Sequence, residues 1–346
     1  MIKPKQLHPG DKVAAVSLSW GGAGTFPHRY QAGKKQLEDT FGVELIEMPN
    51  TLRDAQYLAQ NPQARADDLM QAFADPSIKG IISTIGGDDS LRLLPYMDLD
   101  VIREHPKVFM GYSDTTITHL VCYRAGLVSF YGPAIMAGFA ENGGLFAYMQ
   151  HSVQKTLFTN NSIGMIEENK ERWCVKQWDW ADPANQEKKR ETHPCTGWRY
   201  LQGKGKHSGH LLGGCFEVFD FLRGSDYFPG LSDWEDAILF LDLSEEAPPP
   251  LALKRGLRVY GALGILEQVN GLLLGRPGGE ISVGIFKEYD QVILEVVRDE
   301  LGLANLPIIT NMDYGHTDPM FVLPYGVTAL IDCDEKSFSI IENAVM

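Results

Sequence analysis

The sequence predicts an α/β protein with an N-terminal, mostly parallel sheet covered by helices on both faces and a smaller C-terminal mixed α/β domain. The first reason is that continuous apolar segments alternate with helix-like segments through the first half of the chain, which is typical of parallel sheets buried on both faces. The second is that the part after residue 209 has shorter apolar segments broken by many glycines and prolines, as in a compact mixed domain. The length of 346 residues also fits about two domains.

The elements of the first half follow one another regularly. Each expected strand is a short apolar segment, and each expected helix is a longer segment with apolar residues on one face. The expected strands are Val13–Leu18, Val43–Met48, Gly80–Ile85, Val108–Met110 and Leu127–Tyr131. The expected helices are Arg29–Thr40, one that starts at Asn61-Pro62, Thr115–Ala125 and Leu145–Leu157. Proline suits a first helical turn, and asparagine can cap it.

The expected domains are residues 1–165, a linker over residues 166–208, and residues 209–346. The linker holds four tryptophans among many charged residues and contains proline breakers, so we expect an inter-domain connection that carries a functional loop. The C-terminal strands are expected at Ala237–Leu241, Gly271–Leu274, Pro307–Thr310 and Val327–Ile331, with a helix over Tyr289–Leu301.

Composition excludes several classes of protein. Lys and Arg number 31 against 45 Asp and Glu, for a net charge of −14, so binding of a nucleic-acid polymer would require a concentrated basic patch. The five cysteines include no CxxC pair, which fits reduced thiols in a cytoplasmic protein. No secretory signal and no apolar run near the roughly 20 residues that span a bilayer is evident, so we expect no membrane partner. No motif requires a metal, and the loop Gly21–Gly24 lacks the GxGxxG spacing of a dinucleotide site.

Ser113 is the strongest candidate nucleophile. The turn Gly111-Tyr112-Ser113-Asp114 lies between an apolar strand and a helix, a context in which a strained turn presents a hydroxyl above a sheet edge. Thr115 stands where a GxSxG motif has its second glycine. The alternative is that Ser113 or Asp114 only caps the helix. Gly86-Gly87 ends the preceding strand and could bring backbone amides to the same edge, although it could also be a simple turn.

A serine hydroxyl requires a base to take its proton, usually a histidine. His316 follows a strand and lies in a polar loop beside a glycine, so it is the preferred base, whereas His119 is expected to turn away from the strand edge. Asp242 ends an apolar strand and could fix the histidine tautomer, and Glu245 could take its place. The alternatives are a solvated loop histidine and a strand-end carboxylate that faces water.

Several of these motifs together resemble the serine peptidase family of LD-carboxypeptidases and microcin C self-immunity peptidases. They are residues 65–94, VFMGYSDTT, residues 209–216, ILFLDLSEE and YGHTDPMFVLPYG, in that order along nearly the whole chain. The resemblance implies a flavodoxin-like N-terminal domain, a swivelling barrel-like C-terminal domain, an active site between them, no cofactor and a homodimer.

The resemblance also implies roles for individual residues. Ser113 would be the nucleophile, His316 the general base and then acid, and the backbone amides of Gly87 and Asp114 the oxyanion hole. The triad acid aligns with Asp242, where the family normally has glutamate. Because the aspartate side chain is shorter than that of glutamate by about 1.5 Å, Glu245 is an alternative acid.

The tryptophan-rich insert and the form of Gly86–Ser90 resemble the immunity branch of the family. This implies a small peptidyl- or aminoacyl-nucleotide substrate of the microcin C type, bound with the help of Asp88, Ser90 and either Trp180 or Trp198, since an indole can stack on a nucleobase. These tryptophans could instead close an interface. Two other functions remain open: an LD-carboxypeptidase that trims muropeptide tetrapeptides in cell-wall recycling, and a catalytically impaired protein that binds a nucleotide or peptide.

Overall fold

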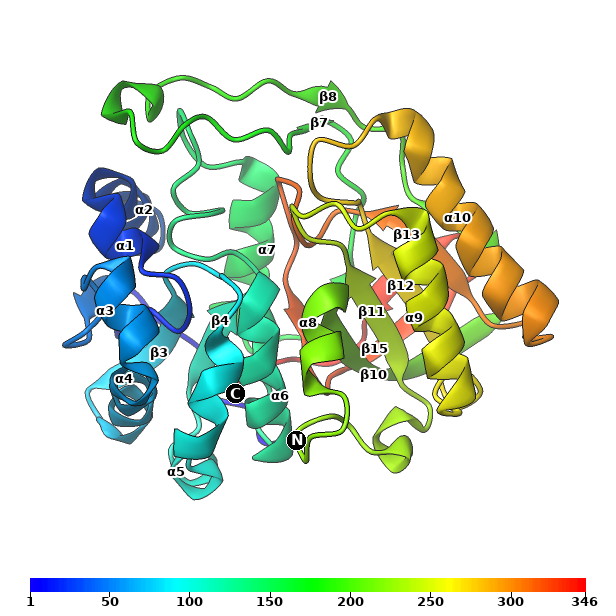
Figure 1. The fold of residues 1–346 in the computed structure, drawn as a ribbon, viewed down its shortest axis with the longest axis horizontal. Coiled ribbons are helices and arrows are strands. Elements are labelled where there is room, and N and C mark those ends of the chain that lie inside the picture. Colours follow the sequence, from blue (N-terminus) through cyan, green and yellow to red (C-terminus); the bar gives the residue numbers. More distant parts are fainter.

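The computed structural model describes all residues from 1 to 346, arranged around two main sheets (Figure 1). The first sheet has six strands in the order β14-β5-β4-β3-β1-β2. Its strands are β1 (Lys12–Val16), β2 (Glu44–Glu47), β3 (Ile78–Ser83), β4 (Val108–Gly111), β5 (Phe130–Tyr131) and β14 (Leu323–Pro324). Strands β1 to β5 are parallel, and β14, from near the C-terminus, pairs antiparallel with β5.

Both faces of this sheet are buried, as alternate residues of β1 show. Val13 and Ala15 belong to one apolar cluster together with residues of α2 and α7, whereas Ala14 and Val16 belong to a second cluster with residues of α4, α5 and α6. The side chains of a strand point alternately to opposite faces, so helices cover both sides. The helices are α1 (Gly22–Thr25), α2 (Pro27–Phe41), α3 (Ala55–Gln60), α4 (Pro62–Ala74), α5 (Leu99–Glu104), α6 (Thr116–Arg124) and α7 (Ala147–Leu157), with 3₁₀ turns η1 (Ser90–Tyr96) and η2 (Ser113–Thr115).

The second sheet has eight strands in the order β6-β16-β15-β10-β11-β12-β13-β9. Strands β10 to β13 are parallel, and the outer strands pair antiparallel. Its strands are β6 (Gly164–Met165), β9 (Arg199–Gln202), β10 (Lys206–Cys215), β11 (Ile238–Asp242), β12 (Gly271–Gly275), β13 (Ile308–Met312), β15 (Thr328–Asp332) and β16 (Ser337–Ile340). Its helices are α8 (Phe216–Leu222), η4 (Leu231–Trp234), α9 (Pro250–Ala262), η5 (Val283–Ile285), α10 (Phe286–Leu294) and the π-helical η6 (Glu295–Glu300). The predicted α/β class, with one mostly parallel and one mixed sheet, is confirmed.

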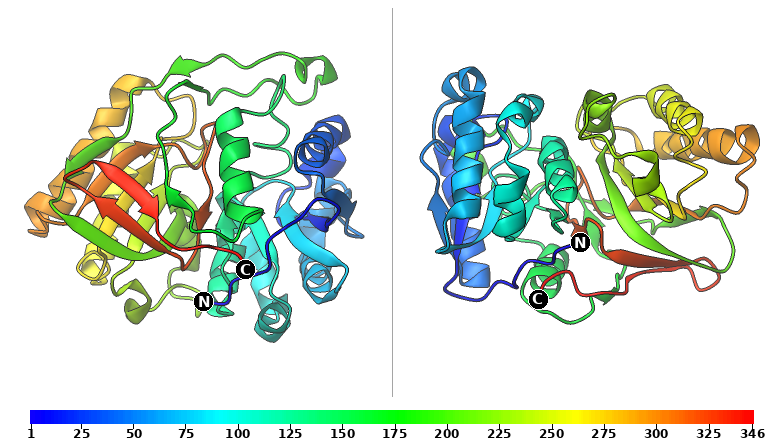
Figure 2. Two further views of the ribbon diagram at one scale, coloured as in Figure 1. Left: turned by 180° about the vertical axis from the view of Figure 1, so that it is seen from behind. Right: turned by 90° about the horizontal axis from the view of Figure 1, so that it is seen from below.

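The segment with four tryptophans is mostly irregular and runs across the top of the view in Figure 1. It contains the two-stranded sheet of β7 (Arg172–Trp173) and β8 (His193–Pro194), and the 3₁₀ turn η3 (Pro183–Asn185). Both chain ends lie on the same side of the molecule (Figure 2), where the amide of Met346 donates to the carbonyl of Pro4 at 2.8 Å. No helix has the length and apolar character needed to span a bilayer.

Candidate active site

Ser113 lies in a sharp turn between β4 and α6. Its φ of 63° is in the left-handed region, which costs a residue with a side chain about 1–3 kcal/mol and is typical of strained functional turns. Gly86, just beyond β3, faces this turn: a Cβ there would lie 2.9 Å from Ser113 Oγ and 2.8 Å from its Cβ. The glycine therefore leaves the space that the hydroxyl occupies.

His316 follows β13 and contacts Asp242, the last residue of β11. The Nδ1 atom of His316 and a carboxylate oxygen of Asp242 form a hydrogen-bonded ion pair, and both side chains are buried. Gly315 permits the approach because a Cβ there would lie 2.5 Å from Asp242 Cβ, and its φ of 90° suits glycine. The shorter acid thus reaches the histidine without the extra methylene of glutamate.

Tyr131, at the end of β5, connects this pair to the serine turn, although no sequence motif had indicated it as a site residue. Its hydroxyl donates to Asp242 Oδ1 at 2.5 Å and accepts from the backbone N–H of Ser113 at 3.2 Å. Asp242 is fully buried and accepts from both partners. The sequence did contain one indication of this role, because Tyr131 ends the strand that pairs with the strand before Ser113.

The acids around His316 favour its protonated form. Burial lowers the pKa of His316, but the Asp242 carboxylate outweighs that effect and, with Glu245 and Glu217, raises the pKa to about 9. A bonded carboxylate at Nδ1 fixes the tautomer and leaves Nε2 for proton transfer.

Glu245 is placed differently from Asp242. Its carboxylate lies 3.3 Å from His316 Nε2, and its side chain is 75% exposed. This is the nitrogen that a nucleophile would approach, so Asp242 and not Glu245 has the geometry of the orienting acid. His316 Nε2 is buried and has no hydrogen-bond partner, so Ser113 and His316 are not hydrogen-bonded in this structure.

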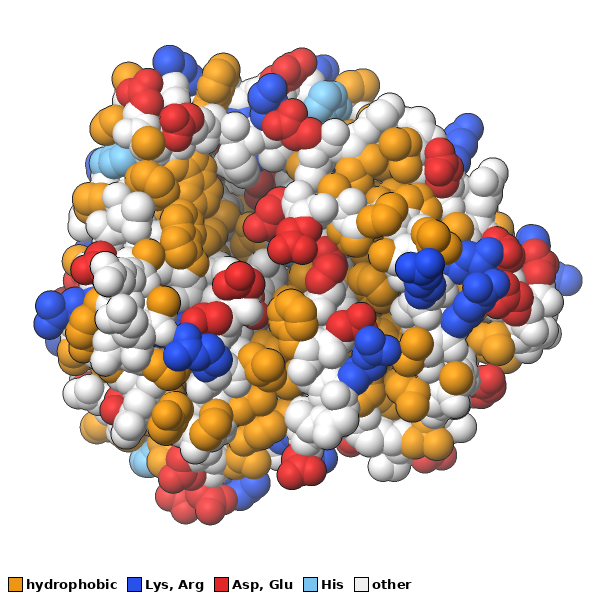
Figure 3. Space-filling view, in the orientation of Figure 1, with side chains coloured by type: hydrophobic (Ala, Val, Ile, Leu, Met, Phe, Trp, Pro, Cys, Tyr) orange, Lys and Arg blue, Asp and Glu red, His pale blue; other side chains and the backbone are white.

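Ser113 and His316 nevertheless line one pocket of about 490 Å³. Side chains from both halves of the molecule surround it, including Trp20, Asp88, Lys176, Trp180, Glu245 and Glu280. Three carboxylates thus face a single lysine, and that lysine lies 3.6 Å from Glu280. In Figure 3 acidic side chains gather in the middle of the face, around the hollow between the two halves.

Trp180 and Trp198 occupy different places. The ring of Trp180 stacks on Trp20 with centroids 6.2 Å apart, contacts Phe26 edge-on and lies under the Arg29 guanidinium at 4.1 Å. Trp198 is buried, and its ring N–H donates to Asp313 at 2.7 Å. Only Trp180 of these two lines the pocket, because Trp198 packs into the core instead.

The residues of the two glycine-rich turns also separate into lining and supporting groups. Gly87 and Asp88 line the pocket. Gly87 has a φ of 145°, and a Cβ there would lie 2.3 Å from Ser19 Oγ. Ser90 is buried, and its hydroxyl donates to the Asp114 carbonyl at 2.9 Å while its N–H donates to the Asp114 carboxylate. Ser90 therefore supports the serine turn. It does not line the pocket, although the sequence analysis expected it to contact the substrate.

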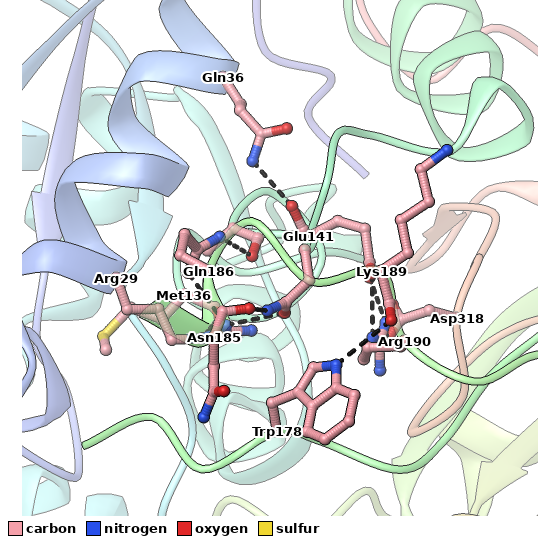
Figure 4. Close-up of polar contacts among 12 residues, drawn as sticks. Arg29, Gln36, Met136, Glu141, Trp178, Asn185, Gln186, Lys189, Arg190 and Asp318 are labelled. Atoms are coloured by element: carbon pink, nitrogen blue, oxygen red, sulfur yellow. Dashed lines mark hydrogen bonds and ion pairs between the residues drawn. The ribbon is translucent and has the colours of Figure 1, made fainter. Parts of the chain in front are cut away.

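A buried ion network holds the tryptophan-rich segment against the rest of the protein (Figure 4). The Arg190 guanidinium contacts both carboxylate oxygens of Glu141 and lies 2.6 Å from Asp318. All three side chains are at least nine-tenths buried. Asp318 lies two residues after His316, and its backbone pairs with that of Cys174, so the network ties the histidine loop to the segment that carries Trp180.

Two clusters contain three possible metal ligands each: Cys215, Asp242 and His316, and Glu141, Cys174 and Asp318. In the first, Asp242 and His316 are bonded to each other, and in the second the two carboxylates bind Arg190. Protein partners therefore already bind the carboxylates of both clusters.

His119 points away from the pocket, as expected. It is buried, with ring nitrogens 2.9 Å from Ser129 Oγ and the Gly111 carbonyl. Burial lowers its pKa to about 3, so it remains neutral and structural at physiological pH.

Models of a known family match both halves of this chain. The LD-carboxypeptidase N-terminal domain matches residues 13–132, and the LD-carboxypeptidase C-terminal domain matches residues 208–331. The chain belongs to the LD-carboxypeptidase family. Its members are serine peptidases, so the hydrolase class expected from the sequence is confirmed.

Individual members of the LD-carboxypeptidase family resemble the chain over nearly its whole length. A putative carboxypeptidase of Vibrio cholerae is 31% identical over 98% of each chain. The microcin C7 self-immunity protein MccF of Escherichia coli is 29% identical over 97% of this chain and 95% of its own. The crystal structure of an MccF-like protein from Streptococcus pneumoniae in complex with AMP is 34% identical, with a TM-score of 0.85 over 95% of this chain and 98% of that one.

Proposed function

We propose that the chain is a cytoplasmic serine peptidase that hydrolyses an amide bond in a peptidyl- or aminoacyl-nucleotide of the microcin C type. The observation that carries this proposal is that Ser113, held at a φ of 63°, and His316, bonded to Asp242, line one pocket. Nucleophile, base and orienting acid come from three separate segments, which is the arrangement that acyl transfer requires.

In the proposed reaction, neutral Nε2 of His316 takes the proton of Ser113 as Oγ attacks the amide carbon. The backbone N–H groups of Gly87 and Asp114 stabilise the oxyanion. The proton then passes to the leaving nitrogen, the C–N bond breaks, and an ester on Ser113 remains. A water molecule, deprotonated by His316, hydrolyses this ester and restores the hydroxyl.

The aromatic wall of the pocket supports a nucleotide substrate. Trp180 is held by Trp20, Phe26 and Arg29, so little side-chain freedom remains to be lost when a base stacks on this wall. Such stacking contributes about 1–3 kcal/mol. The similar protein from Streptococcus pneumoniae was solved with AMP.

A second candidate is an LD-carboxypeptidase that trims muropeptide tetrapeptides, because the part of such a substrate that is cleaved carries no phosphate. The pocket is lined by three carboxylates, from Asp88, Glu245 and Glu280, and by one lysine, Lys176. This excess of negative charge would repel the phosphate of a nucleotide. Both candidates use the same serine chemistry and differ in the leaving group. A side-by-side assay of an aminoacyl adenylate analogue with an amide linkage and a muropeptide tetrapeptide separates them by kcat/KM.

Labelling with a serine-directed phosphonate tests the chemistry itself. Intact-mass measurement is expected to show one adduct on Ser113, formed at least about 100-fold more slowly in His316→Ala because the general base is lost. Equal labelling of both proteins would remove His316 from the role of base. Tight substrate binding without a burst of product, even at stoichiometric enzyme, would indicate the impaired binding protein instead.

Gly86→Ala tests whether the space beside Ser113 is needed. The added Cβ would lie under 3 Å from the serine side chain and displace Oγ, and a misplacement of about 1 Å can cost about 100-fold in rate. We therefore expect phosphonate labelling to slow by about 100-fold, with an unchanged circular dichroism spectrum. Gly284→Ala is the matched control, because its Cβ meets nothing closer than 3.6 Å. Equal labelling rates in the two variants would show that the turn has room to adjust.

A further inference from the structure

Glu245 forms an ion pair with Nε2 of His316, the atom that must accept the serine proton in the proposed reaction. Its carboxylate lies 3.3 Å from His316 Nε2, whereas Asp242 holds Nδ1. The Nε2 atom is buried and makes no hydrogen bond, so the Glu245 contact is an ion pair without hydrogen-bond alignment. A contact of this kind with an exposed side chain is weak and can be displaced.

The charged groups with the largest effect on His316 are acidic. Asp242 comes from β11, Glu245 from the loop that follows it, and Glu217 from α8, and all three raise the pKa of the imidazole. Tyr112 packs edge-on against the ring at 5.0 Å, and burial raises its pKa well above the ordinary value, so it is neutral. The imidazole of the free protein is therefore held as an imidazolium, which cannot accept the serine proton.

The same carboxylate is part of the acidic lining of the pocket. Asp88 and Glu280 lie along it with Glu245. Lys176, the one basic lining residue besides His316, is paired with Glu280. An ammonium group would be attracted by a lining in which three carboxylates outnumber the Lys176 ammonium and the His316 imidazolium, whereas a carboxylate or phosphate would be repelled. The pocket charge thus selects for a positively charged group on the substrate.

We propose that the substrate carries a free primary ammonium that binds Glu245 and draws its carboxylate away from His316 Nε2, so that the substrate itself frees the base. This inference rests on the proposed function and adds the charge class of the substrate. The imidazolium then releases its Nε2 proton to solvent water, and the neutral ring takes the proton of Ser113 as described above. Free amino acid and peptide amines have the required group, and their N-acetylated forms lack it.

The mechanism gives Glu245 two opposite effects. It attracts an ammonium substrate, and it adds to the effect of Asp242 in keeping the base protonated when no ammonium is present. Glu245→Gln removes both effects, so the variant should bind ammonium compounds less well and should react faster with neutral ones. If Glu245 only shaped the pocket, its replacement would not change the reaction rates of the ammonium and neutral compounds in opposite directions.

The test uses two diphenyl phosphonates that differ only at the end of a short alkyl chain, one with a primary ammonium and one with its N-acetyl derivative. Adduct formation on Ser113 at pH 7 is followed by intact mass in the wild-type protein, Glu245→Gln and Glu246→Gln. Glu246 is exposed and does not line the pocket, so its variant controls for the change in net charge.

We expect the wild-type protein and Glu246→Gln to prefer the ammonium probe about fivefold, the size of one exposed ion pair. Glu245→Gln should lose this preference and label faster than the wild type with the N-acetyl probe. An equal preference in all three proteins overturns the role of Glu245 and leaves the serine chemistry standing. Failure of both probes to label the wild-type protein overturns the proposed function as well.

Discussion

Replacing Asp242 with asparagine is expected to lower kcat for amide hydrolysis about 10⁴-fold. Asparagine keeps the size of the side chain but removes the negative charge that faces His316 Nδ1. The neutral amide can also donate to Nδ1, which stabilises the tautomer with its proton on Nε2, and that tautomer cannot take the proton of Ser113. Single-turnover kinetics with saturating substrate measure the chemical step directly.

The pH profile of the same variant gives an independent check. In the wild-type protein the pKa of His316 is about 9, so kcat/KM should rise with pH until the imidazole is neutral near that value. Without the Asp242 charge the pKa falls, and the residual activity should reach its plateau at lower pH. Asp100→Asn is the control, because Asp100 is exposed and pairs only with Arg103. If Asp242→Asn had wild-type activity, a group other than Asp242 would have to be the orienting acid.

Arg190→Met is expected to lower the free energy of unfolding by about 3–5 kcal/mol. The substitution leaves the carboxylates of Glu141 and Asp318 buried without their shared cation, and an unpaired buried charge is costly. Because the network holds the segment with Trp180, KM for a nucleotide substrate should rise more than kcat falls. Urea denaturation and steady-state kinetics measure the two effects.

The loss of stability in Arg190→Met should depend on pH with a definite sign. Burial already raises the pKa of Glu141 even with Arg190 beside it, and removal of the cation raises it further. Glu141 then takes up its proton at a higher pH in the variant than in the wild type, so the difference in stability between the two proteins should shrink as the pH falls. Arg103→Met breaks an exposed pair and should cost less than about 1 kcal/mol. An equal, pH-independent loss in both variants would contradict a buried network.

The sheet that presents the serine could be predicted because its signal is local. The apolar strand Val108–Met110 and the turn at Ser113 are contiguous in sequence, and the structure has β4 ending at Gly111 with the turn directly after it. From the residues alone, Asp242 and Glu245 are both possible partners of His316, and the family resemblance aligns Asp242 with the triad acid. The residue that permits the approach of Asp242 to His316, Gly315, acts through its missing Cβ, and no pattern of neighbouring residues indicates which distant side chain will fill that space.

The other unpredicted parts of the site depend on contacts between segments far apart in the chain. Tyr131 and Asp242 are 111 residues apart, yet their side chains share a hydrogen bond. Trp180 and Trp198 belong to the same tryptophan-rich segment, but Trp180 lines the pocket and Trp198 is hydrogen-bonded to Asp313. The location of Glu245 at Nε2 follows from the path of the loop after β11, which neither composition nor periodicity reveals.

Strand β14 has a consequence for any attempt to divide this protein. Leu323 and Pro324, from near the C-terminus, pair with β5 as the edge of the N-terminal sheet, and the last residue is hydrogen-bonded to Pro4. A gene truncated after the tryptophan-rich segment would encode a sheet without its outermost strand, with the backbone of Phe130 and Tyr131 open to pairing with other chains. The two halves are thus interlaced, and their coexpression as separate fragments would require each to complete the other.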